Sequence, residues 1–375
     1  MGTTINGPHA AGAGPAAALA GGNEAEDFWR GRRVLLTGHT GFKGSWMSLW
    51  LRLLGAEVTG IALAPLTKPN LWSLVADGVR SLMVDVRDTP AVAAAVARAD
   101  PEIVIHMAAQ ALVRESYRDP LGTFATNVIG TANLLEACRA LPRLRCVVIA
   151  TSDKVYANDG AGRAFREEDR LGGHDPYSGS KACAELLTAS WRASFYADGP
   201  AVATVRAGNV IGGGDWAAER LIPDCARALD SGGPVRLRHP DSVRPWQHVL
   251  EPVCGYLSFA AALAGPQSRL PAALNFGPDP GSFCSVREVV EAFSAQFAGR
   301  PHWERDGGAH PPEAAALTLS SDLAARALGW RPRLGLAEGL AWTAEWYRRH
   351  RAGEDMLEFS RRQICDYRAL GRLQS

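Results

Sequence analysis

The chain has 375 residues, of which 47% are hydrophobic and 21% are charged. This is the composition of a folded globular protein, long enough for a large core in two lobes, and it excludes intrinsic disorder and a collagen-like structure. Lys and Arg number 40 against 39 Asp and Glu, which leaves a formal net charge of +1. A charge near zero excludes a global field that would draw the chain to nucleic acid or to an anionic membrane, so any anionic ligand must be held locally.

Residues 1–26 are rich in Ala, Gly, Asn and Thr and contain no Lys or Arg. This composition predicts a flexible extension, because the charged start of a signal peptide and the basic face of a transit peptide are both missing. No run of about 20 apolar residues occurs, so no membrane-spanning helix is expected. The 7 Cys are scattered singly, without the spacing of a zinc site or of a disulfide framework, and this favours a reducing cytoplasm.

From Arg33 onward, short apolar runs alternate with longer segments of helical periodicity, the pattern of parallel βαβ units. The runs predict strands at Arg33–Thr37, Glu57–Ala62, Ser81–Val84, Ile103–Met107, Cys146–Ala150, Ala201–Val205 and Leu274–Phe276. Helices are predicted near 43–54, 90–99, 120–140, 178–197 and 338–351. The predicted fold class is α/β, a Rossmann-type doubly wound parallel sheet with a smaller, irregular α/β substrate-binding lobe.

The alternation of strands and helices loosens after Arg206, where glycines and prolines interrupt it. We expect one domain at 27–206 and a second lobe, the place for a substrate, formed mainly by 207–375. The strand near 274–276 is expected to return to the sheet of the first domain.

The first predicted strand leads into Gly38-His39-Thr40-Gly41-Phe42-Lys43-Gly44 and then into a helix. Three glycines at this spacing let the backbone turn tightly and approach a pyrophosphate, while the helix N-terminus faces the phosphates. A glycine triplet alone is weak support, but a strand before it and a helix after it predict a dinucleotide site. Its residues would be Gly38, Thr40, Gly41, Phe42 and Gly44. Lys43 either adds positive charge there or is a solvated lysine.

The end of the second strand lacks the acidic residue that usually binds the adenosine ribose, since the chain has Ile61-Ala62-Leu63-Ala64-Pro65 there. This segment leaves both NAD and NADP open, because it has no arginine for a 2′-phosphate although Lys68 lies close by in sequence. Asp85, followed by Val86 at the end of the third strand, is placed to reach the adenine amino group. The alternative is that Asp85 caps the next helix.

Polar residues gather where the fifth strand ends, as Ser152-Asp153-Lys154. Ligands of doubly wound sheets bind outside the carboxyl ends of the strands, so Ser152 is expected to face the site. Tyr177 and Lys181 are four residues apart and therefore share one face of the helix that follows. A lysine ammonium one turn from a phenol lowers the pKa of the phenol, which makes Tyr177 a usable base for a sugar or alcohol hydroxyl.

Several segments carry a resemblance to a known class of enzymes. The glycine loop, the Tyr177/Lys181 pair, His106-Met107-Ala108-Ala109 and residues 127–137 resemble the extended short-chain dehydrogenase/reductases that act on nucleotide sugars. Residues 40–46, 151–154, 206–216 and 244–249 resemble, within that class, the CDP-glucose 4,6-dehydratase family. The chain departs from the pattern of that family at Val155, where a cysteine is expected, and at Ala64, where an acid is expected. The second departure weakens the cofactor assignment.

The resemblance implies NAD as the cofactor, with Ala108 beside it, and CDP-glucose or a related nucleotide sugar as the substrate. It implies oxidation at glucose C4, loss of water across C5 and C6, and return of the hydride to C6. Tyr177 would take the C4 hydroxyl proton while Ser152 bonds the C4 oxygen. Asp153 would protonate the leaving C6 hydroxyl, and Lys154 would take the C5 proton. Related dehydratases carry Asp-Glu where this chain has Asp153-Lys154. The alternative role for Lys154 is therefore only to pair with Asp153.

The resemblance also places Gln110, Asn209, Arg220 and Arg244 at the nucleotide sugar, and arginine suits a diphosphate. For Arg244 the alternative is a surface ion pair. The resemblance implies a homodimer or higher homo-oligomer, with contacts through the helices near 120–140 and 178–197. It also implies a place in deoxysugar biosynthesis, such as that of lipopolysaccharide O-antigen. No metal site and no nucleic-acid or membrane partner is expected.

Two other functions fit the same scaffold. A 4-epimerase would use Tyr177, Lys181 and a serine, but it needs no acid/base pair directly after that serine, so Asp153-Lys154 favours dehydration. A non-catalytic module that only senses NAD(P) would be expected to lose Tyr177 or Lys181, and the chain keeps both.

Overall fold

A computed structural model describes residues 27–265, 270–297, 303–308, 310, 314 and 316–373. The extension expected at 1–26 lies outside the described residues.

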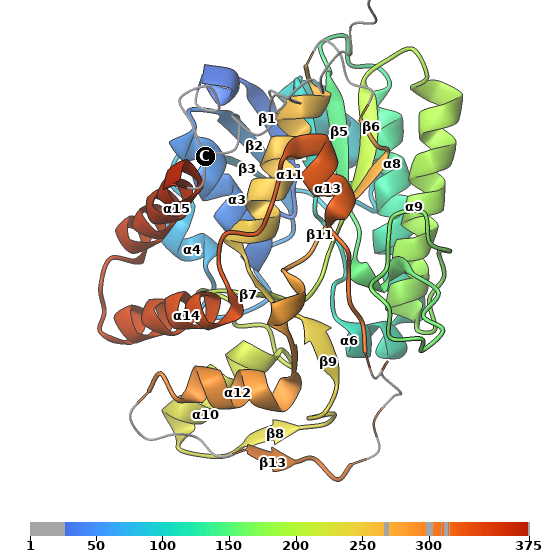
Figure 1. Ribbon diagram of the computed structural model, residues 1–375. Helices are drawn as coiled ribbons and strands as arrows, with labels where there is room; N and C mark the ends of the chain where they lie inside the picture. The colour runs from blue at the N-terminus through green and yellow to red at the C-terminus, as the bar shows by residue number, and fades with distance from the viewer. Residues whose placement is uncertain are drawn as a thin grey trace, which may run out of the picture.

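Seven strands form the central sheet, in the order β11-β6-β5-β4-β1-β2-β3 (Figure 1). The strands are β1 Arg33–Thr37, β2 Glu57–Ala62, β3 Arg80–Met83, β4 Ile103–His106, β5 Cys146–Ala150, β6 Ala201–Ala207 and β11 Ala273–Phe276. All six neighbouring pairs are parallel. The order starts at the centre with β1 and runs outward in both directions, as in doubly wound folds. The predicted α/β class is confirmed, and each strand end lies within two residues of the predicted one.

Helices surround the sheet on both faces and fill the second lobe. They are α3 Phe42–Leu53, α4 Trp72–Val75, α5 Thr89–Ala99, α6 Val113–Arg118, α7 Pro120–Phe124, α8 Gly130–Cys138, α9 Pro176–Phe195, α10 Leu221–Ser231, α11 Leu250–Leu263, α12 Val286–Ser294, α13 Asp322–Leu328, α14 Leu336–Arg351 and α15 Met356–Leu373. Within the described part of the chain, none of them combines the length and the apolar character needed to cross a bilayer.

Side chains of each strand alternate between the two faces of the sheet. On one face, Leu36 packs in a core with Trp46 and Trp50 of α3. On the other face, Leu35 packs in a second core with Val92 of α5 and residues of α8. Because both faces are covered, the strands are apolar throughout rather than alternating in polarity, which is why the sequence predicted parallel strands.

The region predicted as one helix at 120–140 is built in three parts, α7, a π-helical turn at Ala125–Ile129 and α8. The π turn buries Asn127, whose side-chain amide donates to the carbonyl oxygen of Gln110 at 3.0 Å and to Oγ of Ser180 at 2.9 Å. The helical stretch predicted near 120–140 is therefore confirmed, with one wide turn inside it. The wider turn places one polar side chain inward, where it joins two neighbouring segments.

The second lobe lies beyond the carboxyl ends of the strands (Figure 1). It contains α10, α12 and short two-stranded pairs. These pairs are β8 Val235–Leu237 with β13 Trp303–Arg305, β9 Val243–Pro245 with β12 Phe283–Ser285, and β7 Val210–Ile211 with β10 Gln247–His248. This lobe faces the edge of the sheet at which ligands of such folds bind.

Two of the helices from beyond residue 206 pack against α3 of the first domain rather than in the second lobe. The first is α11, which lies in the core that holds α3. The second is α15, whose Tyr367 ring lies 5.6 Å from the ring of Trp50 in α3. The Tyr367 hydroxyl also donates to Glu251 of α11 at 2.6 Å, and all three side chains are buried. α15 therefore joins α3 to α11 on the outside of the sheet.

Candidate active site

The glycine loop closes tightly against β1 and the residues after β4. Gly38 has φ +74°, and a Cβ there would lie 2.7 Å from the backbone nitrogen of Ala108. A Cβ on Gly44 would lie 2.1 Å from the carbonyl oxygen of Gly38, so the first turn of α3 can pack on the loop only without a side chain. Oγ1 of Thr37 accepts from the backbone nitrogens of Met107 and Ala108, which fixes Ala108 beside the loop.

The N-terminus of α3 has the form of a phosphate site. Its N-cap is Gly41, which is exposed and supplies no side-chain cap. The positive end of the helix dipole is therefore left for a ligand, and these residues fit the pyrophosphate of a dinucleotide. Oγ1 of Thr40 donates to the carbonyl of Leu63 at 2.8 Å, and Phe42 packs against Gly212 of the second lobe.

At the adenosine end of the expected site, Asp85 is paired with Arg87 at 2.6 Å, and this partner lowers the pKa of its carboxyl. The residue that caps α5 is Asp88, so the structure does not have Asp85 as the helix cap. Val86 is buried against Gly130 of α8. His39 lies over Gly60 of β2 and contacts Oγ of Ser81 at 2.6 Å, close to the strand end where an acid was missing.

The segment after β5 begins the catalytic cluster. Oγ of Ser152 donates to Oδ1 of Asp153 at 3.0 Å and accepts from the backbone nitrogen of Lys154 at 3.2 Å. Asp153 is buried, and its Oδ2 has no hydrogen-bond partner among the described residues. Burial raises the pKa of this carboxyl, although the charges of Lys154, Arg244 and Lys43 oppose the shift. Lys154 is half-buried on the same turn.

Tyr177 and Lys181 face this segment from α9, which Asp175 caps. The ammonium of Lys181 donates to the carbonyl of Ala150 at 3.0 Å, and burial lowers its pKa to about 8. Burial raises the pKa of the Tyr177 phenol, and hydrogen bonding with Ser152 only partly opposes the shift. Among the charges that act on this phenol, Arg220 lowers its pKa and Asp153 raises it, and the lowering by Lys181 that the spacing predicts stays a prediction.

Lys43 turns from the glycine loop toward the catalytic cluster. Its ammonium lies 5.5 Å from the ring centre of Tyr256 in α11, and it interacts electrostatically with Arg220 and Asp153. Tyr256 is a residue that the sequence analysis missed. Its phenol lies close enough to Tyr177 and Asp153 that their negative charges raise its pKa further, after burial as the main cause. A tyrosine within an otherwise apolar helix was the available signal.

The expected substrate residues divide into two groups. Arg244 on β9 is buried, not at the surface, and its charge lowers the pKa of Asp153. Arg220 precedes the first residue of α10, and its charge acts to lower the pKa of Lys43 and of Tyr177. Asn209 is half-buried between β6 and β7.

Gln110 lies apart from this group, because its side chain is bonded within its own region of the fold. Its amide nitrogen donates to Leu112 and Thr123, and its oxygen accepts from the backbone of Leu112.

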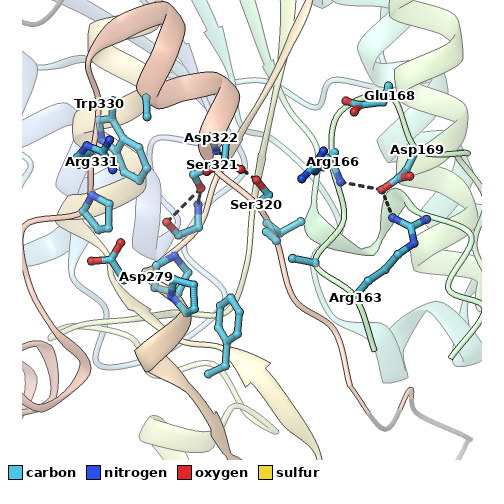
Figure 2. A pocket seen from close by; sticks show the side chains of 18 residues that line it. Arg163, Arg166, Glu168, Asp169, Asp279, Ser320, Ser321, Asp322, Trp330 and Arg331 are labelled. Carbon is cyan, nitrogen blue, oxygen red and sulfur yellow. Dashed lines mark hydrogen bonds and ion pairs between the residues drawn. The ribbon is translucent and has the colours of Figure 1, made fainter. Parts of the chain in front are cut away.

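A separate cavity of about 590 Å³ lies beside the end of β11. Figure 2 shows Arg163, Arg166 and Asp169 on one side of it and Trp330, Arg331 and Asp279 on the other. None of the predicted catalytic or cofactor residues lines it. The catalytic cluster is therefore a different place from this cavity.

A doubly wound sheet, an uncapped glycine turn and a serine, tyrosine and lysine at the strand ends together define an enzyme of the short-chain dehydrogenase/reductase class. Residues 34–270 match the NAD dependent epimerase/dehydratase family, and the chain belongs to it. Its cofactor is NAD.

Relatives in this family include dehydratases and epimerases. The chain is 45% identical to a CDP-glucose 4,6-dehydratase of Salmonella typhimurium over 350 residues, 91% of this chain and 98% of that one. It is 32% identical to a dTDP-glucose 4,6-dehydratase of Streptomyces antibioticus, over 85% of this chain and 93% of the relative. The crystal structure of Thermus thermophilus UDP-glucose 4-epimerase with NAD aligns with a TM-score of 0.73 and 30% identity, covering 84% of this chain and 99% of the other.

Gly44→Ala is expected to destabilise the protein by about 1–3 kcal/mol and to reduce its bound NAD, because the added Cβ would push α3 from the glycine loop. Thermal unfolding and the NAD content of the purified protein measure the two effects. Gly281→Ala is the control, since a Cβ there meets nothing within 4 Å. A Gly44→Ala protein with full stability and full NAD content would contradict the packing described here.

Lys43→Met is expected to stabilise the protein by about 1–2 kcal/mol at neutral pH, since burial lowers the pKa of Lys43 to about 8. Between pH 8 and the ordinary lysine value of 10.5, the folded lysine is neutral while the unfolded one is charged. The free energy of unfolding of the wild type should rise over this pH window, and the difference in stability between Lys43→Met and the wild type should shrink. Thermal unfolding from pH 7 to pH 10.5 tests this, with the exposed Lys68→Met as control. A difference independent of pH would refute the assignment.

Proposed function

We propose that this protein dehydrates CDP-glucose to CDP-4-keto-6-deoxyglucose and keeps NAD bound through the cycle. The observation that carries the proposal is the acid/base pair Asp153-Lys154 on the same turn as Ser152, facing Tyr177 and Lys181. An oxidation site and an elimination site thus meet at one strand end. CDP-glucose is the preferred substrate because the relative with 45% identity is a CDP-glucose 4,6-dehydratase.

The oxidation is carried by α9 and Ser152. The glycine loop and the N-terminus of α3 would hold NAD, which would supply the hydride acceptor for C4 and the hydride donor for C6. Ser152 holds the C4 oxygen and Tyr177 takes the C4 hydroxyl proton. Since burial raises the pKa of Tyr177, the positive charge of Lys181 on the next turn is what favours the phenolate.

The elimination is carried by the turn after β5. The 4-ketone acidifies the C5 proton, which Lys154 takes as a neutral amine. Asp153 donates its proton to the C6 oxygen, so that the C6–O bond breaks and water leaves. The raised pKa of Asp153 favours the protonated form that this role needs, and its unpartnered Oδ2 can contact the substrate.

The diphosphate is held by positive charge from the second lobe. Arg244 on β9 and Arg220 at the start of α10 supply guanidinium groups, which suit phosphate oxygens, and Asn209 supplies an amide. Arg220 is only weakly paired, with Asp215 at 3.8 Å, so it can turn to a ligand.

The direct test incubates the purified protein with CDP-, dTDP-, UDP- and GDP-glucose and identifies products by mass. We expect loss of one water from CDP-glucose without added reductant. A product of unchanged mass would indicate an epimerase, and loss of water only from another nucleotide sugar would change the assigned substrate.

Tyr177→Phe and Asp153→Asn should stop the reaction at different stages. Without the Tyr177 hydroxyl, the C4 proton has no acceptor, and turnover should fall by about 100- to 10,000-fold without formation of NADH. Asp153→Asn keeps the shape but cannot protonate the C6 oxygen, so bound NADH should form and persist. Absorbance at the NADH band after substrate addition measures both. If Asp153→Asn blocked cofactor reduction while still binding substrate, the roles assigned here would be wrong.

We also propose a homodimer through α7, the π turn and α9. Leu121, Ile129 and Leu186 on these neighbouring elements are 82%, 52% and 61% exposed, an unusual number of large apolar side chains in one region. A second copy of the chain would cover them. The proposed setting is a reducing cytoplasm, where the free cysteines remain thiols, and a pathway to deoxysugars such as those of lipopolysaccharide O-antigen.

Leu186→Glu should shift the protein from dimer to monomer in sedimentation velocity, because it buries a charge in the proposed interface. Leu66→Glu is the matched control, since Leu66 is 93% exposed after β2, away from α9. A dimer that persists unchanged in Leu186→Glu would place the interface elsewhere.

A further inference from the structure

A buried ion pair lies directly behind the catalytic cluster. Glu185 of α9 and Arg206 of β6 are 5% and 3% exposed. Arg206 binds the carboxylate at two points, from Nε to Oε1 at 2.8 Å and from Nη2 to Oε2 at 2.9 Å. Oγ1 of Thr204 adds a third bond to Oε2 at 2.7 Å. Such a two-point pair fixes the relative orientation of α9 and β6.

The ion pair holds the catalytic turn at both of its ends. Oε1 of Glu185 accepts from Oγ1 of Thr151 at 2.5 Å, immediately before Ser152. Nη1 of Arg206 donates to the hydroxyl of Tyr156 at 2.8 Å, and that hydroxyl donates to Asn275 of β11 at 2.7 Å. The turn that carries Asp153 and Lys154 is therefore bracketed by contacts to one pair of charges.

The same pair is connected to the oxidation residues. Tyr177, Lys181 and Glu185 are spaced four residues apart along α9 and share one face. Lys181 binds the carbonyl of Ala150 and Glu185 binds Thr151, so two successive turns of α9 hold two successive residues at the end of β5.

The wall of the cavity in Figure 2 is joined to this network as well. Nη1 of Arg206 donates to the carbonyl of Glu167 at 3.2 Å. The ring of Tyr156 stacks on Phe165, with centres 4.9 Å apart and planes 5° apart. The loop at 163–169, which supplies part of the cavity wall, is thus bonded to the network and packed on it.

We propose that Glu185 and Arg206 are positioning residues for the elimination half of the reaction. Their ion pair fixes the turn of Asp153 and Lys154 relative to α9, so that the acid and the base meet the same bound sugar that Tyr177 and Lys181 oxidise. This inference rests on the proposed function.

The elimination depends more on the pair than the oxidation does. Tyr177 and Lys181 are carried by α9 itself, so their place does not depend on the turn. Asp153 and Lys154 lie on the turn, and their place relative to the sugar follows from its two anchored ends. A shift of the turn would therefore leave oxidation in place and misalign proton delivery to C6.

The experiment follows one turnover of CDP-glucose in the NAD-bound enzyme and records the formation and the decay of bound NADH separately. Thr151→Val and Tyr156→Phe each remove one hydroxyl from the network and keep the packing, and Glu185→Gln removes the charge of the pair. We expect NADH formation near the wild-type rate and decay slowed about 10- to 100-fold, with release of 4-keto-glucose nucleotide before water is lost. Glu185→Gln should show the larger effect.

Thr188→Val is the matched control, because Thr188 is buried one turn further along α9 and its hydroxyl bonds only to Ala184 within the helix. It should leave both rates unchanged. The inference is overturned if Thr151→Val and Tyr156→Phe slow NADH formation and NADH decay equally, or if they change neither rate. This holds whether or not Glu185→Gln folds. Wild-type enzyme that releases no dehydrated product from CDP-glucose would instead overturn the proposed function.

Discussion

Burial of the Asp153 carboxylate among cations is the interaction on which the site depends. A carboxylate removed from water is costly unless positive charge lies near it, and buried lysines are equally costly without an anion. Here the compensating charges come from α3, from the turn after β5 and from β9 of the second lobe. The cluster therefore exists only when the glycine loop, the central sheet and the second lobe are all in place. The same lack of water raises the pKa of Asp153, which favours the protonated acid that the proposed elimination needs.

Much of the fold could be predicted because its strands are buried on both faces, so that apolar β-branched runs mark them without ambiguity. The catalytic residues could be predicted for a related reason. Ser152 ends a strand and Tyr177 opens a helix, and in a parallel sheet both positions meet at one edge. Periodicity does not report which way a side chain points across a gap between elements. The sequence therefore left Lys43 either at the phosphates or in solvent, and it did not indicate the contact of Lys43 with Tyr256.

Two features of the site region could not be predicted from periodicity. Burial raises the pKa of the Tyr177 phenol. The helical region near 120–140 is present as predicted, but it contains one wide turn. Asn127 makes that turn favourable by bonding to Gln110 and Ser180, which are distant in sequence. Both outcomes depend on tertiary surroundings.

The packing of α15 has a consequence for the order in which the molecule can be completed. Among the described elements α15 is the last to leave the ribosome, yet its Tyr367 lies against Trp50 of α3 and bonds to Glu251 of α11. During synthesis, the outer side of the glycine-loop helix therefore stays uncovered while the remaining chain is made. A nascent chain that stalls before this helix will leave Trp50 of α3 and Glu251 of α11 without the cover of Tyr367, and chaperones can bind such uncovered core surface.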